Sequence, residues 1–171
     1  IDATEGVTEQ DTKVAGMAHE AGKASIIVVN KWDLVEKDGK TLIEYEKSLR
    51  EKIAPFKDVD IIFASALTKQ RLLKVLEAAL QVYANRTQKI KTSELNRIML
   101  EAIENYPPPS LKGKYVKIKY ITQLPTHAPS FAFYCNLPQY VKDPYKRYLE
   151  NQIRENWKFT GVPIQIFMRK K

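Results

Sequence analysis

Three polar residues follow an apolar run in the first half of this chain. Residues Ile26–Val29 are apolar and β-branched, which is typical of a strand buried on both faces in a parallel sheet. Asn30, Lys31 and Asp33 come directly after this run. Because open α/β sheets bind ligands at the carboxyl ends of their strands, these side chains are candidate binding residues.

The spacing Asn30-Lys31-x-Asp33 fits recognition of guanine. Guanine presents a ring N1–H beside an exocyclic amine, and one carboxylate can accept from both, so we expect Asp33 to select guanine over adenine. Asn30 is expected to contact N7 and O6 or to tie neighbouring loops together, while the Lys31 stem lies on the base. Ala66 follows the next apolar run, and its amide is expected to donate to guanine O6. The alternative is an ordinary strand-end turn.

Alternating strands and helices are expected to position these residues. Thr8 and Asp11 resemble a capping box at the start of a helix, with Asp in place of the usual Glu or Gln. Apolar spacing predicts helices over residues 8–22, 42–53 and 68–83, and strands over 24–30 and 60–64. This order implies right-handed crossovers and a parallel sheet.

The order of elements changes after the polar segment 85–92, which we interpret as a boundary between domains 1–87 and 88–171. Apolar patterns then predict an α-β-β-α-β order. The expected elements are a helix at 95–103, strands at 114–122 and 130–136, a helix at 143–157 and a strand at 162–171.

The strand expected at 114–122 has alternating residue types. Val116, Ile118 and Tyr120 are expected to share its apolar face, opposite Lys117 and Lys119.

Charge divides at the same boundary. Residues 1–86 hold 13 Lys and Arg against 14 Asp and Glu, a net charge of −1, whereas residues 87–171 hold 15 against 6, a net charge of +9. The asymmetry indicates two modules with different partners, one of them nucleic acid.

Composition excludes several classes of site. The single Cys135 rules out a disulfide within the chain and a Cys-cluster zinc site, and His19 and His127 are far apart, so we expect no metal ligands. A reducing, cytoplasmic compartment fits this cysteine usage. No apolar run approaches the roughly 18 residues of a membrane span, so we expect no membrane partner.

Several segments resemble the bacterial tandem-GTPase family called Der or EngA. NKWD at 30–33 and SAL at 65–67 resemble the fourth and fifth guanine-recognition motifs of P-loop GTPases, and DATEGVTEQD at 2–11 resembles the family's strand end and loop after switch II. YKRYLENQIRE at 145–155 and GVPIQIFMRKK at 161–171 resemble the end of its C-terminal KH-like domain.

The resemblance implies an α/β fold in which part of a P-loop GTPase domain precedes an α+β KH-like domain. It implies GTP or GDP as ligand, Mg²⁺ in the intact parent, and a role in assembly of the large ribosomal subunit. Because the chain starts at Ile1 without Met, we expect a piece of a longer protein. Its partners would be ribosomal RNA or the large subunit, and the missing G-domain segments. The guanine-binding residues it implies are Asn30, Lys31, Asp33, Ser65, Ala66 and Leu67.

Two departures from the family pattern matter. A P-loop has the form G-x-x-x-x-G-K-[ST] between a strand and a helix, and the nearest imitation, residues 16–23, has one residue too many and the reverse order of elements. We therefore predict no catalytic residue in this chain. The G-x-x-G loop with which KH domains clamp RNA is also missing, since Gly113 and Gly161 stand alone in residues 87–171.

Basic side chains of the second domain are still expected to contact RNA phosphates. The alternative for each is a solvated surface that serves solubility. The candidates are Lys114, Lys117, Lys119, Lys146, Arg147, Arg154 and Lys158.

Two other functions stay open at this point. The chain could be an RNA-binding or protein-interaction module whose NKWD sequence is idle, or an Era-like GTPase with a true KH domain. The missing G-x-x-G argues against the second, and guanine-nucleotide binding by the longer parent would exclude the first.

The chain of 171 residues alone should neither hold GTP tightly nor hydrolyse it. The triphosphate carries most of the charge that a nucleotide site must compensate, and the P-loop amides, lysine and magnesium that do so are missing. Titration of labelled GTP and GDP into this chain, with the longer parent alongside, tests this. Micromolar binding or turnover by the short chain would contradict it.

Overall fold

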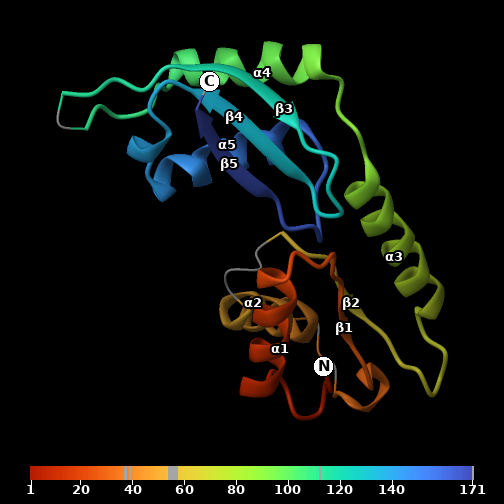
Figure 1. The fold of residues 1–171 in the computed structure, drawn as a ribbon. Helices are drawn as coiled ribbons and strands as arrows, with labels where there is room; N and C mark the ends of the chain where they lie inside the picture. Colours follow the sequence, from red (N-terminus) through yellow and green to blue (C-terminus); the bar gives the residue numbers. More distant parts are fainter. Residues whose placement is uncertain (37, 39, 54–57, 112, 171) are drawn as a thin grey trace. The chain divides into compact units, whose positions relative to one another are not determined.

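The chain forms two compact units in a computed structural model that describes residues 1–36, 38, 40–53, 58–111 and 113–170 (Figure 1). The first unit comprises Ile1–Arg86 with Thr160–Pro163, and the second comprises Thr87–Phe159 with Ile164–Lys171. None of the helices in the described ranges is long and apolar enough to cross a membrane.

The first unit alternates helices with short strands. It contains α1 (Glu9–Glu20), β1 (Ile27–Val29), the 3₁₀ turn η1 (Trp32–Leu34), α2 (Thr41–Lys52), β2 (Ile61–Phe63) and α3 (Leu72–Thr87). β1 pairs with β2 in parallel, with Ile27 opposite Ile61 and Val29 opposite Phe63. The predicted parallel sheet is confirmed, although each paired strand is shorter than its apolar run.

The start of the chain adds a third parallel segment beside β1. Asp2 forms a parallel bridge with Asn30. The Asn30 amide donates to the Ile1 carbonyl at 2.8 Å, and the Ala3 amide donates to the Asn30 carbonyl at 2.9 Å. Asp2 therefore lies beside Asn30, the first residue after β1.

Local capping explains where α1 begins and ends. The Asp11 amide donates to Thr8 Oγ1 at 3.2 Å and the Thr8 amide donates to Asp11 Oδ2 at 2.9 Å, so the capping box is present. Gly22 follows the helix with a φ of 65°, which suits glycine. Both predicted limits of this helix are confirmed.

The predicted start of α3 at residue 68 was wrong. Residues 66–69 form a turn that the Ser65 amide closes by donating to the Gln70 carbonyl at 3.1 Å. The helix begins only at Leu72, because this turn uses the backbone groups that an earlier helical turn would need.

The closing strand also begins later than predicted. Thr160–Pro163 groups with the first unit, where the Gly161 amide donates to the Asp58 carbonyl at 2.8 Å. Gly161 has a φ of 75°, and a Cβ there would lie 2.6 Å from the Ser25 carbonyl oxygen. Glycine is thus required, and β5 starts at Gln165 rather than 162.

The second unit follows the predicted α-β-β-α-β order, with a 3₁₀ turn added. Its elements are α4 (Thr92–Asn105), β3 (Ile118–Gln123), β4 (Ser130–Cys135), η2 (Pro138–Tyr140), α5 (Asp143–Asn156) and β5 (Gln165–Lys170). The sheet order is β3-β4-β5, with β3 antiparallel and β5 parallel to β4.

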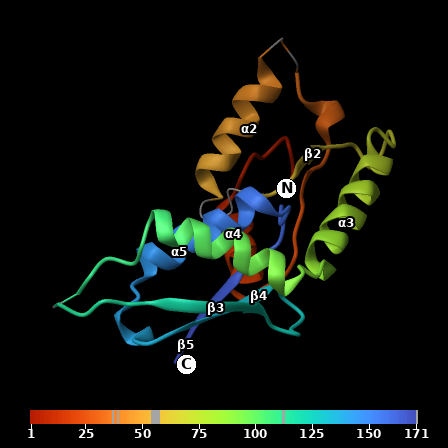
Figure 2. The same cartoon turned by 90° about the horizontal axis from the view of Figure 1, so that it is seen from above.

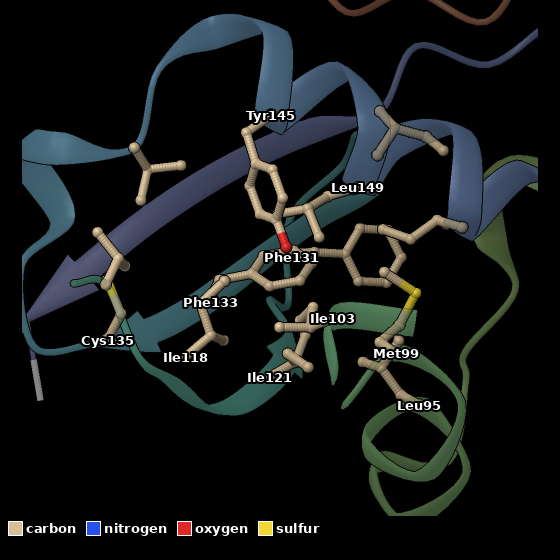
Figure 3. Packing of buried hydrophobic residues seen from close by; sticks show 14 of the residues in the cluster. Leu95, Met99, Ile103, Ile118, Ile121, Phe131, Phe133, Cys135, Tyr145 and Leu149 are labelled. Atoms are coloured by element: carbon tan, nitrogen blue, oxygen red, sulfur yellow. The ribbon is translucent and has the colours of Figure 1, made fainter. Parts of the chain in front are cut away.

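Both long helices of this unit pack on one face of the sheet (Figures 2 and 3). Phe131, Phe133 and Cys135 of β4 point into the core with exposures of 0%. Leu95 and Met99 reach them from α4, and Leu149 and Tyr145 from α5. The Tyr148 hydroxyl of α5 donates to the Ala102 carbonyl of α4 at 2.9 Å. Burial raises the pKa of the Cys135 thiol.

An irregularity in β3 overturns the predicted alternation. Ile118 pairs with Cys135, but the next pair is Tyr120 with Tyr134, which leaves Lys119 as an extra residue. A bulge of this kind shifts the phase of all later side chains. Ile121 therefore enters the core at 0% exposure, and Tyr120, predicted to share the face of Ile118, is 43% exposed.

Substituting Phe133 with Ala should destabilise the second unit by about 3–5 kcal/mol, because the ring is fully buried. Phe167→Ala is the matched control, since this ring is 41% exposed, and should cost about 1 kcal/mol or less. Urea unfolding followed by the amide signals of β4 measures both. Equal losses would show that the core is not where we place it.

Candidate functional site

Three chain segments bring their polar residues to one edge of the small parallel sheet. Asp2 lies beside Asn30 at the ends of two parallel segments, and Ser65 follows β2 after one residue. Because parallel strands run in one direction, the residues after them meet at the same edge. The predicted positions of Asn30, Lys31, Asp33 and Ser65 at strand ends hold in the structure.

Asn30 ties two of these loops together. Its Oδ1 accepts a hydrogen bond of 3.0 Å from the Ala66 amide, 36 residues away. This is one of the two roles predicted for the side chain. The Ala66 amide is thus held by Asn30, and donation to a guanine O6 requires it to share or exchange this partner.

Lys31 stands in an ion pair that the sequence did not reveal. Its Nζ lies 2.6 Å from Asp2 Oδ2, and Asp2 Oδ1 accepts from the Thr4 amide at 2.9 Å. The Lys31 hydrogen bond, followed by those of Thr4, holds the pKa of Asp2 well below its ordinary value, and Asp2 in turn raises the pKa of Lys31. Asp2 was missed because its neighbour across the sheet is distant in sequence.

Asp33 lies on η1, which Trp32 anchors. The Trp32 indole is 3% exposed, and its ring centroid lies 4.4 Å from that of Phe63 and 5.4 Å from that of Tyr45. The Trp32 amide donates to the Ala64 carbonyl at 3.1 Å. The aromatic residue inside NKWD therefore fixes the turn that presents Asp33.

The Asp33 carboxylate keeps unused acceptor capacity. Its Oδ1 is buried, and within the described ranges it has no hydrogen-bond partner. A buried acceptor without a donor costs about 1–3 kcal/mol. The arrangement suits a ligand that brings paired donors, as guanine does.

Ser65 and Leu67 have different surroundings in the second loop. Ser65 is fully buried, and its Oγ accepts from the Thr68 amide at 3.1 Å, so it shapes the turn. Leu67 is 86% exposed.

Backbone strain is concentrated in these two loops. Among the described residues, the non-glycine positions with positive φ are Lys31, Lys69 and Arg71, at 59–61°. Such conformations are costly for residues with a Cβ and persist where the surroundings impose them. The strained backbone conformations therefore lie in the loops of the candidate site and not in the two hydrophobic cores.

The basic candidates of the second unit differ in whether their side chains are already paired within the protein. Arg154 donates to Glu150 Oε1 at 2.9 Å and to the Phe159 carbonyl at 3.1 Å, and Lys146 pairs with Asp143 at 2.9 Å. These contacts occupy the two side chains within the protein. The remaining candidates, Lys114, Lys117, Lys119, Arg147 and Lys158, are exposed.

Comparison with known proteins matches each half of the chain to a domain. The model for the Elongation factor Tu GTP binding domain matches residues 1–85, and the model for the KH-domain-like C-terminal domain of EngA bacterial GTPase enzymes matches residues 89–169. GTPase Der of Flavobacterium johnsoniae is 60% identical over 171 residues, which are 100% of this chain and 39% of that protein. Over its whole length, the chain is similar to part of the GTPase Der proteins.

A second relative shows the same similarity. GTPase Der of Bacteroides thetaiotaomicron is 58% identical over 173 residues, covering 100% of this chain and 40% of that protein. The chain thus spans about two fifths of the length of these Der relatives. A solved structure of Era, in complex with MgGDPNP and nucleotides 1506–1542 of 16S ribosomal RNA, matches at 18% identity and a TM-score of 0.43, over 100% of this chain and 63% of that chain.

The donors and acceptors at this edge of the sheet suit one part of a guanine nucleotide. The carboxylate of Asp33, the amide of Ala66 and the side chain of Asn30 offer the acceptors and donors that a base can pair with. A P-loop is missing from the sequence.

Asn30→Ala should free the Ala66 amide for exchange with solvent. Loss of one hydrogen bond worth about 1 kcal/mol predicts roughly fivefold faster amide exchange, measured by NMR hydrogen exchange. Asn136→Ala is the matched control, because Asn136 Oδ1 accepts from the Lys117 amide at 2.8 Å in the second unit. It should speed exchange at Lys117 and leave the exchange of Ala66 unchanged. If Asn30→Ala leaves the exchange of Ala66 unchanged, the hydrogen bond between Asn30 and Ala66 is refuted.

Proposed function

We propose that this chain supplies the guanine-recognition end of a GTP-binding domain together with a KH-like domain, in a GTPase that assembles the large ribosomal subunit. Its ligand is GTP or GDP, and its expected setting is the cytoplasm. The proposed base site consists of six residues in the two loops. They are Asn30, Lys31, Asp33, Ser65, Ala66 and Leu67.

The observation that carries this proposal is the buried Oδ1 of Asp33, which has no hydrogen-bond partner among the described residues, in the loop that Asn30 ties to the next one through Ala66. An idle turn would be free to satisfy its carboxylate with its own backbone amides. Here the acceptor is kept free while the loops around it are cross-linked and strained, which is the arrangement of a preorganised ligand site.

The site divides recognition of the base from compensation of the phosphates. Lys31, the one cation in NKWD, is paired with Asp2, so its charge is already balanced. A neutral base is compatible with this edge, and a triphosphate needs further positive charge. We assign that charge, and Mg²⁺, to segments that Der relatives hold outside the matched two fifths.

The second unit is proposed to contact RNA or the ribosome. The net charge of residues 87–171 is +9, which favours an anionic partner. The five exposed candidates Lys114, Lys117, Lys119, Arg147 and Lys158 are better placed for phosphates than Arg154 or Lys146, whose charges are paired.

Asp33→Asn in the longer protein should weaken GTP binding by about 10- to 100-fold, because an amide cannot accept both guanine donors and a bidentate pair is worth about 1–3 kcal/mol. Xanthosine triphosphate, which offers an acceptor in place of the exocyclic amine, should bind better than to the wild type. Competition titrations with the two nucleotides measure the change in preference.

Asp38→Asn is the matched control for this experiment. Asp38 Oδ1 accepts from the Lys40 and Thr41 amides before α2, and Asn serves equally well in that role. The control should keep the wild-type preference for GTP. If Asp33→Asn also keeps it, the base site is misassigned and a binding module without nucleotide function becomes the better reading.

A further inference from the structure

The sheet of the second unit has one face that no helix of the described ranges covers. Because α4 and α5 pack against Phe131, Phe133 and Cys135, the alternate residues of β4 point to the other side. The resulting open sheet face is defined by six residues in two cross-strand rows. They are Tyr120, Tyr134 and Arg169 in one row, and Thr122, Ala132 and Phe167 in the next. Tyr120, Arg169 and Phe167 are exposed, Tyr134 and Thr122 are half-buried, and Ala132 is buried.

Three aromatic rings, one from each strand, lie on this face. Tyr120 and Phe167 are 43% and 41% exposed. The Tyr120 and Tyr134 ring centroids are 6.0 Å apart, with the rings inclined at 43°, and Phe167 is paired with Ala132, two residues from Tyr134. Exposed rings grouped on a sheet are unusual unless they contact a partner.

The bulge in β3 is what places Tyr120 there. Strict alternation from Ile118 would send Tyr120 into the core with Val116, but the extra residue Lys119 reverses the phase. Lys119 itself is exposed. One irregularity thus adds an aromatic ring to the face and an amine at its edge.

Charge on this unit is segregated in a way that selects the partner. All six carboxylates of residues 87–171 lie in α4 or α5, and the three strands contain none. Arg169 and Lys119 form no ion pair within the described ranges. The face therefore offers aromatic rings and unpaired cations to a partner that must be anionic.

Single-stranded nucleic acid has the matching chemistry. Unpaired bases stack on aromatic side chains, and phosphates pair with Arg and Lys alongside. Some RNA-binding domains use the aromatic residues of an open sheet in this way, whereas KH domains use a G-x-x-G loop, which residues 87–171 lack.

We propose that the open sheet face is a stacking platform for single-stranded RNA, on which Tyr120, Tyr134 and Phe167 contact bases while Arg169 and Lys119 contact phosphates. This inference rests on the RNA contact proposed above and names its surface. The platform binds single-stranded RNA segments. It does not stack on the bases of a duplex, because these are already stacked on one another.

The test replaces the exposed rings and keeps their apolar bulk. The double variant Tyr120→Ile/Phe167→Ile in the 171-residue chain should bind a fluorescein-labelled 12-nucleotide oligoadenylate RNA about tenfold or more weakly than wild type. The slope of log affinity against log salt should stay the same, because no charge has changed. Arg169→Gln should instead lower that slope by about one.

Three controls separate stacking from other effects. Tyr115→Ile removes a ring that is 77% exposed and outside the six residues, and Tyr120→Phe keeps the ring without the hydroxyl; both should bind like wild type. Binding to a 12-base-pair RNA duplex should be equal for wild type and the double variant. Thermal unfolding of each variant checks that the second unit is folded.

The outcomes distinguish this inference from the proposed function. If wild type binds the oligonucleotide with a steep salt slope and the folded double variant binds equally well, the platform is overturned while RNA contact stands. If wild type binds neither RNA, or binds without salt dependence, the RNA part of the proposed function fails and the platform with it. A tenfold loss confined to single strands supports the platform.

Discussion

The parallel register between Ile27–Val29 and Ile61–Phe63 is the constraint on which the candidate site depends. It aligns the carboxyl ends of the two strands, so that the loops after them begin at the same level. Asn30 can then reach the Ala66 amide, and Trp32 can pack on Phe63 while its amide bonds the Ala64 carbonyl. A register slip of one residue would turn the side chains of one strand to the opposite face and break these contacts together.

Stability and binding make different demands on these loops. Trp32 supplies the packing that holds the first loop, and Ser65 the buried hydroxyl that shapes the second. The left-handed backbone at Lys31, Lys69 and Arg71 works against stability. Anchored residues thus alternate with strained ones, and the strained ones lie where the loops turn.

Patterns that depend on neighbours in sequence were predictable. The α1 capping box, the strand ends that carry Asn30 and Asp33, and the α-β-β-α-β order all follow from local spacing. What depends on distant pairing was not predictable. The Asp2–Lys31 ion pair joins residues 29 positions apart, and the late start of α3 depends on a backbone bond from Ser65 to Gln70. The bulge at Lys119 is visible only once β3 is aligned with β4, because the residue types alternate regularly from Val116 to Tyr120.

That bulge has a consequence for how the second unit can change over evolution. Deleting Lys119 alone would remove the extra residue and leave Tyr120 outward and Ile121 inward, because each would keep its present partner on β4. If Lys119 were kept and the strand lost its bulge, strict alternation would instead turn Tyr120 inward and Ile121 outward. Among relatives, a one-residue gap between the positions of Ile118 and Tyr120 would therefore mark the loss of the bulge with the exposed face unchanged.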